Sequence, residues 1–139
     1  MMNTLAQDVE VLIVDDEPDV RRAVKRFLGR GGFHVRAVGS AEEALDIIRR
    51  RPVAVLLADI KLAGVDGLSL LRQAEVICPE TVRIVFSAAA AEQELQEWID
   101  TGRIFQYIPK PMDLSEFRQT LRRAVDRYFE NRGEVPFCA

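Results

Sequence analysis

The sequence alternates five times between a short apolar run and a longer amphipathic stretch. The apolar runs, which predict strands, are residues 11–14, 34–38, 53–58, 82–86 and 104–108. Runs rich in Val, Ile and Leu are typical of strands that are buried on both faces. The stretches between them carry apolar residues at intervals of three and four, which indicates helices. Strands that alternate with helices predict an α/β fold with a parallel sheet covered on both faces.

Capping residues mark where two of the predicted helices begin. Ser40 is followed by Glu43, and Asp113 is followed by Glu116, so both pairs have the spacing of a capping box. The first box predicts a helix that runs to Arg50. The second predicts a helix that covers most of the remaining chain.

Length and charge limit the class of protein. A chain of 139 residues is close to the usual size of one domain. We expect one folded domain over residues 9–129, with an N-terminal extension at 1–8 and a tail or the start of a linker at 130–139. The 19 basic and 22 acidic residues give a net charge of −3, which argues against direct binding of nucleic acid through a general positive field.

The sequence also indicates a compartment. Two cysteines are too few for a disulfide framework, no apolar run is long enough to cross a bilayer, and the N-terminus lacks the pattern of a signal peptide. We therefore expect a cytoplasmic protein that makes no contact with a membrane.

Polar residues follow directly where the predicted strands end. These residues are Asp15, Asp16, Asp59, Ser87 and Lys110. Parallel strands joined by right-handed crossovers end at one edge of the sheet, so the five side chains should converge there. Neighbouring carboxylates repel one another unless a cation joins them, and a set of oxygen ligands selects Mg²⁺. Such an ion could align a phosphoryl group on Asp59, which stands alone at its strand end and is the best nucleophile.

Four segments in the right order carry a family resemblance. VLIVDDEP, LLADIKLAGVDG, VFSA and YIPKP resemble the receiver domain of bacterial two-component response regulators, of the chemotaxis-receiver type. The resemblance covers residues 9–129. It implies a flavodoxin-like (βα)5 fold with a doubly wound, five-stranded parallel sheet in the strand order 2-1-3-4-5.

The resemblance implies a phospho-acceptor and a metal site. Asp59 would accept a phosphoryl group from a histidine kinase or a phosphotransfer protein. Asp16, Asp59 and the backbone carbonyl of Lys61 would ligate Mg²⁺, with Asp15 acting largely through water. Such a domain is a switch that catalyses its own phosphorylation and dephosphorylation, and not an enzyme in the usual sense. The side chain of Lys61 stands at the mouth of this site, and we expect it to alter autodephosphorylation by changing how water reaches the acyl phosphate.

The resemblance also implies a switch. Ser87 would hydrogen-bond the phosphoryl group and move toward it, Lys110 would pair with the phosphate, and Tyr107 would turn inward in response. The output would be a change of the face formed by the fourth helix, the fifth strand and the fifth helix. That face would control a partner or an output domain, or a phosphorylation-dependent homodimer.

Three other interpretations stay open from the sequence. The chain fits a stand-alone receiver, and it fits equally the N-terminal receiver of a longer transcriptional or cyclic-dinucleotide regulator. A phosphatase of the haloacid dehalogenase type would use Asp15 as its nucleophile, but Asp15-Asp16-Glu17 lacks that family's Asp-x-Asp spacing. A flavodoxin-like cofactor binder would need a Gly-rich phosphate loop after the first strand, and none is present there.

Overall fold

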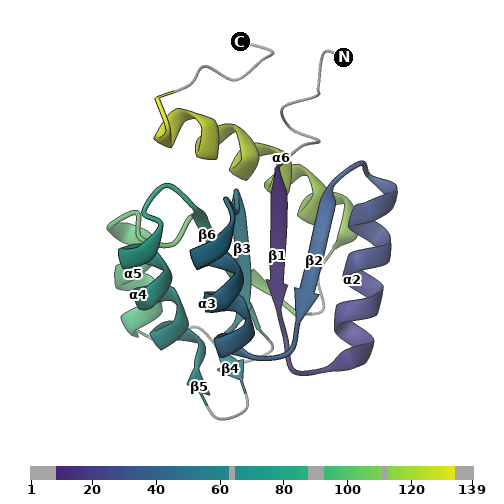
Figure 1. The fold of residues 1–139 in the computed structure, drawn as a ribbon, viewed down its shortest axis with the longest axis horizontal. Helices are drawn as coiled ribbons and strands as arrows, with labels where there is room; N and C mark the ends of the chain where they lie inside the picture. Colours follow the sequence, from purple (N-terminus) through teal and green to yellow (C-terminus); the bar gives the residue numbers. More distant parts are fainter. Residues whose placement is uncertain (1–8, 63–64, 88–92, 111–112, 134–139) are drawn as a thin grey trace.

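A single parallel sheet forms the centre of the protein (Figure 1). The computed structural model describes residues 9–62, 65–87, 93–110 and 113–133. The strands of the sheet are β1 (Glu10–Val14), β2 (His34–Val38), β3 (Val55–Asp59), β6 (Val82–Ser87) and β7 (Gln106–Pro109). They lie in the order β2-β1-β3-β6-β7, and every neighbouring pair is parallel. β6 and β7 are the fourth and fifth strands of this sheet in chain order. The predicted α/β fold and its strand order 2-1-3-4-5 are therefore confirmed.

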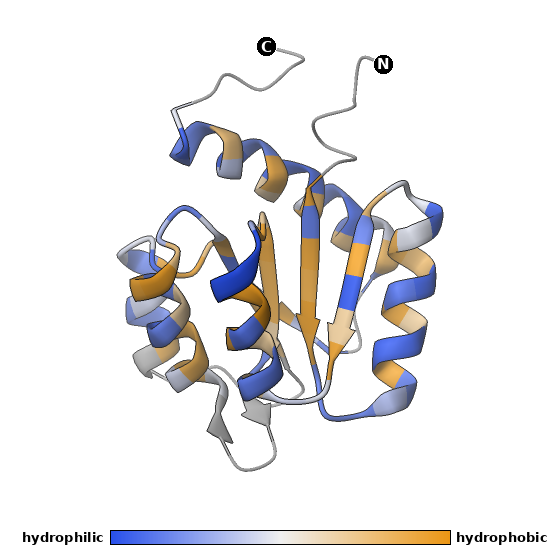
Figure 2. Cartoon of the chain, viewed as in Figure 1, coloured by the Kyte–Doolittle hydropathy of each residue, from blue (hydrophilic) through white to orange (hydrophobic). Residues whose placement is uncertain are grey.

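Helices cover both faces of the sheet. The helices are α2 (Pro18–Arg30), α3 (Ala41–Arg50), α4 (Gly67–Ile77), α5 (Gln93–Asp100) and α6 (Leu114–Asn131). One face is covered by α2 and α6, and the opposite face by α3, α4 and α5 (Figure 1). In Figure 2 the central strands are apolar along most of their length, while α2 and α3 carry polar residues on the side away from the sheet.

Both predicted helix caps are present. The Ser40 hydroxyl accepts a hydrogen bond from the Glu43 backbone amide at 3.2 Å. The Asp113 carboxylate accepts two, from the amides of Ser115 at 2.9 Å and Glu116 at 3.1 Å. These side chains satisfy amide groups that the first turn of a helix leaves without partners.

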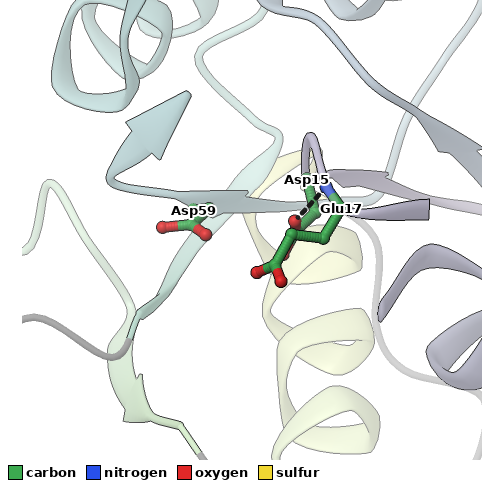
Figure 3. A group of neighbouring side chains, drawn as sticks. All are labelled: Asp15, Glu17 and Asp59. Atoms are coloured by element: carbon green, nitrogen blue, oxygen red, sulfur yellow. Dashed lines mark hydrogen bonds between the residues drawn. The ribbon is translucent and has the colours of Figure 1, made fainter. Parts of the chain in front are cut away.

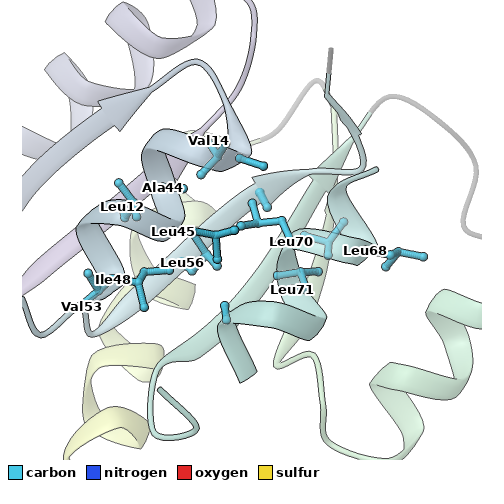
Figure 4. Close-up of a cluster of buried hydrophobic side chains, with 14 of the residues drawn as sticks. Leu12, Val14, Ala44, Leu45, Ile48, Val53, Leu56, Leu68, Leu70 and Leu71 are labelled. Carbon is cyan, nitrogen blue, oxygen red and sulfur yellow. The ribbon is translucent and has the colours of Figure 1, made fainter. Parts of the chain in front are cut away.

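Alternation along the strands divides the core into two clusters. In β1, Leu12 and Val14 point to the face covered by α3 and α4, whereas Val11 and Ile13 point to the face covered by α2 and α6. Figure 4 shows the first cluster, in which leucines from α3, α4 and β3 pack together. Because successive side chains of a strand point to opposite faces, β1 contributes to both clusters.

Some boundaries differ from the sequence-based expectation. The third strand begins at Val55 and the fifth at Gln106, each two residues later than predicted. A small antiparallel pair, β4 (Lys61–Leu62) and β5 (Val65–Asp66), lies in a segment for which the sequence predicted no strand. Strands of two residues are too short to show any period, which is why the sequence did not reveal them. Among the described residues, no helix combines the length and the apolar character that crossing a membrane requires.

Candidate functional site

Three of the predicted site residues meet at the carboxyl edge of the sheet. Asp15 directly follows β1, Asp59 ends β3 and Lys110 directly follows β7. The Lys110 Nζ lies 2.8 Å from Oδ2 of Asp15 and 3.0 Å from Oδ2 of Asp59. The two carboxylates are adjacent because β1 and β3 pair in register, with Val14 opposite Ala58. The predicted convergence of these three side chains is confirmed.

The charges of this group are buried and compensated. Asp15 is fully buried, Asp59 is 7% exposed, and the Lys110 side chain is 15% exposed. Two carboxylates at such low exposure need a nearby cation, because a lone buried charge is strongly disfavoured. Burial of the ammonium lowers the pKa of Lys110, but its bonds to Asp15 and Asp59 outweigh that effect and raise it overall. The lysine therefore stays charged at neutral pH and holds the two carboxylates together.

A third carboxylate, that of Glu17, also belongs to the site, although the sequence did not predict it as a site residue. Oxygen atoms of Asp15, Glu17 and Asp59 all lie within 4.8 Å of one another (Figure 3). The Glu17 amide also donates to Oδ1 of Asp15 at 2.8 Å, so the two residues form a hydrogen-bonded turn before α2. Asp16 lies between them, is exposed and is not one of the three. The only available signal was the acidic run 15–17, which does not reveal which carboxylates lie near Asp59; Glu17 does so although its side chain is 65% exposed.

The donor chemistry of this group suits a hard divalent ion. Carboxylate oxygens are the ligands that Mg²⁺ prefers, and Mg²⁺ commonly takes one or two of them together with water and phosphate oxygens. The metal role that the sequence predicted for Asp16 stays a prediction, as does that of the Lys61 carbonyl. Lys61 is the first residue of β4 and lies two positions after Asp59.

Gly67 packs against the backbone of Asp59 and Ile60. The Gly67 amide donates to the carbonyl of Ile60 at 2.8 Å at the start of α4. A Cβ atom at position 67 would lie 2.2 Å from the Asp59 carbonyl oxygen, far closer than any side chain allows. The absence of a side chain therefore lets α4 begin directly against the strand end that carries Asp59.

Two further predicted residues lie on neighbouring strands. Ser87 is the last residue of β6 and pairs with Pro109 of β7. Tyr107 lies in β7, is half-buried, and packs against the core cluster on the face of α3, α4 and α5. These backbone positions fit the predicted switch roles, which stay predictions.

Comparison with known sequences identifies relatives. The family model described as "Response regulator receiver domain" matches residues 11–122. The hydrogenase transcriptional regulatory protein HoxA of Cupriavidus necator is 36% identical over 116 residues, which are 84% of this chain and 24% of HoxA. The DNA-binding transcriptional regulator NtrC of Klebsiella pneumoniae is 32% identical over 120 residues, which are 86% of this chain and 25% of NtrC. The chain thus spans about a quarter of the length of these relatives.

Solved structures show the same fold. A CheY-like response regulator receiver domain protein from Methanospirillum hungatei superposes with a TM-score of 0.81 at 25% identity, over 88% of this chain and 97% of that one. NtrX from Brucella abortus superposes with a TM-score of 0.80 at 28% identity, over 89% of this chain and 28% of NtrX. The match over residues 11–122, the strand order and the acidic site with its lysine agree with one another. The chain belongs to the response regulator receiver domain family of two-component signalling.

Proposed function

We propose that this receiver is a phosphorylation-driven switch in which Asp59 accepts a phosphoryl group from a histidine kinase or a phosphotransfer protein. In this step the N–P bond of a phosphohistidine breaks and an O–P bond forms to a carboxylate oxygen of Asp59. The imidazole nitrogen keeps the electron pair of the broken bond and takes up a proton. The product is an acyl phosphate, which a carboxylate nucleophile forms directly.

The observation that carries this proposal is the shared contact of Lys110 with Asp59 and Asp15. A fixed ammonium 3.0 Å from the acceptor carboxylate is positioned to meet the charge of an incoming phosphoryl group. Asp59, which is 7% exposed, is more accessible than Asp15. Asp15 is fully buried, and its two carboxylate oxygens already accept bonds from the Glu17 amide and from Lys110. This argues against the phosphatase interpretation, in which Asp15 would attack.

The reaction depends on Mg²⁺. Asp16, Asp59 and the Lys61 carbonyl would hold the ion, and Asp15 would act largely through water. Glu17 adds negative charge within the same group of oxygens. The bound ion supplies neutralisation of the phosphoryl oxygens, which lowers the barrier to attack by an anionic carboxylate. The protein's own part is to keep the carboxylates close together, ionised and correctly oriented.

Phosphorylation changes the face formed by α5, β7 and α6. Ser87 ends the strand next to Asp59 and hydrogen-bonds the phosphoryl group, and Tyr107 follows by turning inward. Support comes from the register, which places Ser87 beside Pro109 and Val85 beside Tyr107 on adjacent strands. The two states differ in free energy, and the new charge shifts their populations.

The output is control of a larger regulator in the cytoplasm. The relatives HoxA and NtrC are transcriptional regulators, and this chain matches about a quarter of each. The domain accordingly acts as the receiver of a transcriptional regulator and makes no direct contact with nucleic acid itself. A stand-alone receiver that docks to a separate partner is the alternative output.

Lys61 sets how long the phosphoryl group survives. It lies two residues beyond the acceptor, at the start of β4, where a cation changes how water reaches the acyl phosphate. Lys61→Ala should change the half-life of the phosphorylated protein, measured as the decay of the adduct by mass spectrometry. An unchanged half-life would refute this role.

Intact-mass spectrometry after incubation with acetyl phosphate tests the proposed function. The wild type should gain one phosphoryl group, about 80 Da, only when Mg²⁺ is present, and Asp59→Asn should gain none. A full gain in Asp59→Asn, or a gain that ignores Mg²⁺, would contradict the proposal. Asp15→Asn serves as a second control, because the phosphatase interpretation predicts loss of the adduct there and not in Asp59→Asn.

A further inference from the structure

An arginine of α2 contacts the backbone of the acidic site. Arg21 is half-buried, and its Nη1 donates to the carbonyl oxygen of Asp15 at 2.7 Å. A charge-assisted bond of this length is among the stronger hydrogen bonds in proteins. Arg21 lies six residues after Asp15 and reaches back from the first turns of the helix to the end of β1.

This bond completes the fixation of Asp15. The backbone amide of Asp15 donates to the Val38 carbonyl at 3.1 Å. One carboxylate oxygen accepts from the Glu17 amide at 2.8 Å and the other from Lys110 at 2.8 Å. With the carbonyl held by Arg21, both the peptide groups and the side chain of Asp15 are held in place. The bond from Arg21 fixes the orientation of the peptide group that links Asp15 to Asp16, at the start of the turn that carries Glu17.

Gly39 provides the space through which the guanidinium passes. A Cβ atom at position 39 would lie 2.9 Å from Nη1 of Arg21 and 3.4 Å from its Cζ. Gly39 is not among the glycines with a positive φ, so an alanine there would meet no backbone strain. A side chain at position 39 would therefore press on the end of Arg21 and displace it, whereas the backbone conformation itself does not require glycine.

The neighbouring arginine shows that this contact is specific. Arg22 lies on the same turn of α2 and pairs with Asp19, and both side chains are largely exposed. Arg22 carries the same charge as Arg21, but within the described part of the chain its partner is Asp19 and not the acidic group. It is the matched control for loss of one positive charge near the site.

We infer that Arg21 is a positioning residue for the acidic site, acting through the Asp15 carbonyl, and that Gly39 keeps its path open. The inference rests on the proposed function, because the Mg²⁺ site and the phospho-acceptor are those of the preceding section. Partners in the outer shell that orient ligands typically change metal affinity by about 10- to 100-fold when removed. Charge alone predicts the opposite sign, since removal of a nearby cation would strengthen the binding of Mg²⁺.

The experiment is a Mg²⁺ titration of the unphosphorylated protein by calorimetry. Arg21→Ala should bind Mg²⁺ at least about tenfold more weakly than the wild type, and Arg22→Ala should bind it within about twofold of the wild type. Gly39→Ala keeps the arginine but displaces its end, so it should weaken binding by less than Arg21→Ala does. Arg21→Ala combined with Gly39→Ala should be no weaker than Arg21→Ala alone, because both changes break one interaction.

Two results would overturn the inference: wild-type Mg²⁺ affinity in Arg21→Ala, or additive losses in the double variant. Thermal unfolding and the emission of Trp98 check that each variant is folded. If Arg21→Ala does not fold, Arg21→Met decides the question, because it keeps the aliphatic stem and removes the hydrogen-bond donor. Failure of the proposed function looks different, since the wild type itself would then neither bind Mg²⁺ nor accept a phosphoryl group. A wild type that does both beside an unaffected Arg21→Ala would refute only the role of Arg21.

Discussion

The ammonium of Lys110 lies 3.0 Å from Oδ2 of Asp59, although 51 positions separate the two residues in the chain. The same ammonium bonds Asp15 at 2.8 Å, so one cation joins the carboxyl ends of three strands. This contact couples the stability of the sheet edge to the chemistry of the proposed acceptor. A receiver that loses the lysine should change in both respects.

Lys110→Met should destabilise the protein. The change leaves Asp15 fully buried and Asp59 nearly so without their shared cation. Removing one partner from a buried polar contact costs about 1–3 kcal/mol in the free energy of unfolding. Urea unfolding at pH 7 with a chelator present measures it, and added Mg²⁺ should restore part of the loss. A variant as stable as the wild type without Mg²⁺ would contradict this account of the site.

The contribution of Lys110 should have a defined pH dependence. Its pKa in the folded protein lies above the ordinary value of 10.5, because the bonds to Asp15 and Asp59 outweigh the opposing effect of burial. A lysine pKa raised by folding adds stability that is fully present below the unfolded-state pKa and is lost as pH rises through the folded-state pKa.

The difference in free energy of unfolding between the wild type and Lys110→Met should therefore stay constant from about pH 7 to pH 9. It should shrink only above pH 10.5. Urea unfolding of both proteins at each pH measures the difference. A decline between pH 7 and pH 9 would mean that the lysine is not held in its charged form as described.

Gly67→Ala should damage both the fold and the site. The new Cβ would lie 2.2 Å from the Asp59 carbonyl oxygen, so α4 or the strand end must move. Overpacking of this kind typically costs about 1–3 kcal/mol, and acetyl phosphate should label the variant more slowly. Gly29→Ala is the matched control, because nothing lies within 4 Å of its Cβ and it lies inside α2. That control should be neutral or stabilising by up to about 1 kcal/mol, since alanine favours helix more than glycine does.

Trp98 should report on the packing between α4 and α5. The guanidinium carbon of Arg103 lies 4.0 Å from the centre of the Trp98 ring, and Glu75 of α4 accepts a bond from Arg103 Nη2 at 2.8 Å. Arg103→Met should cost about 1 kcal/mol, from the cation–π contact and a half-exposed ion pair. Because the chain has one tryptophan, its emission comes from Trp98 alone, and Arg103 is the nearer of the two guanidinium groups over its ring. Emission identical to that of the wild type would show that the stack is absent in solution.

The sequence predicted the sheet and the convergence of Asp15, Asp59 and Lys110, because both follow from general rules. Apolar runs specify buried parallel strands, and parallel strands end at a common edge. Glu17 was missed because the run 15–17 offers three carboxylates, and only the turn before Pro18 decides which of them faces Asp59. The β4–β5 pair was missed because strands this short carry no periodic signal.

Arg21 and Gly39 show a different limit. An arginine in an amphipathic helix and a glycine after a strand have ordinary explanations, namely a solvated face and a turn. Their relationship depends on a side chain that reaches back six residues and passes a backbone from another strand. No spacing rule connects these positions, so only the three-dimensional arrangement reveals the contact.

Locating the phosphoryl group on the chain tests the central claim most directly. After labelling with acetyl phosphate and Mg²⁺, reduction with borohydride converts an aspartyl phosphate to homoserine, which lowers the mass of its peptide by about 14 Da relative to aspartate. We predict that this change maps to Asp59 and to no other carboxylate. Reduction at Asp15 or at another acidic residue, with Asp59 unmodified, would contradict the assignment of Asp59 as the phospho-acceptor.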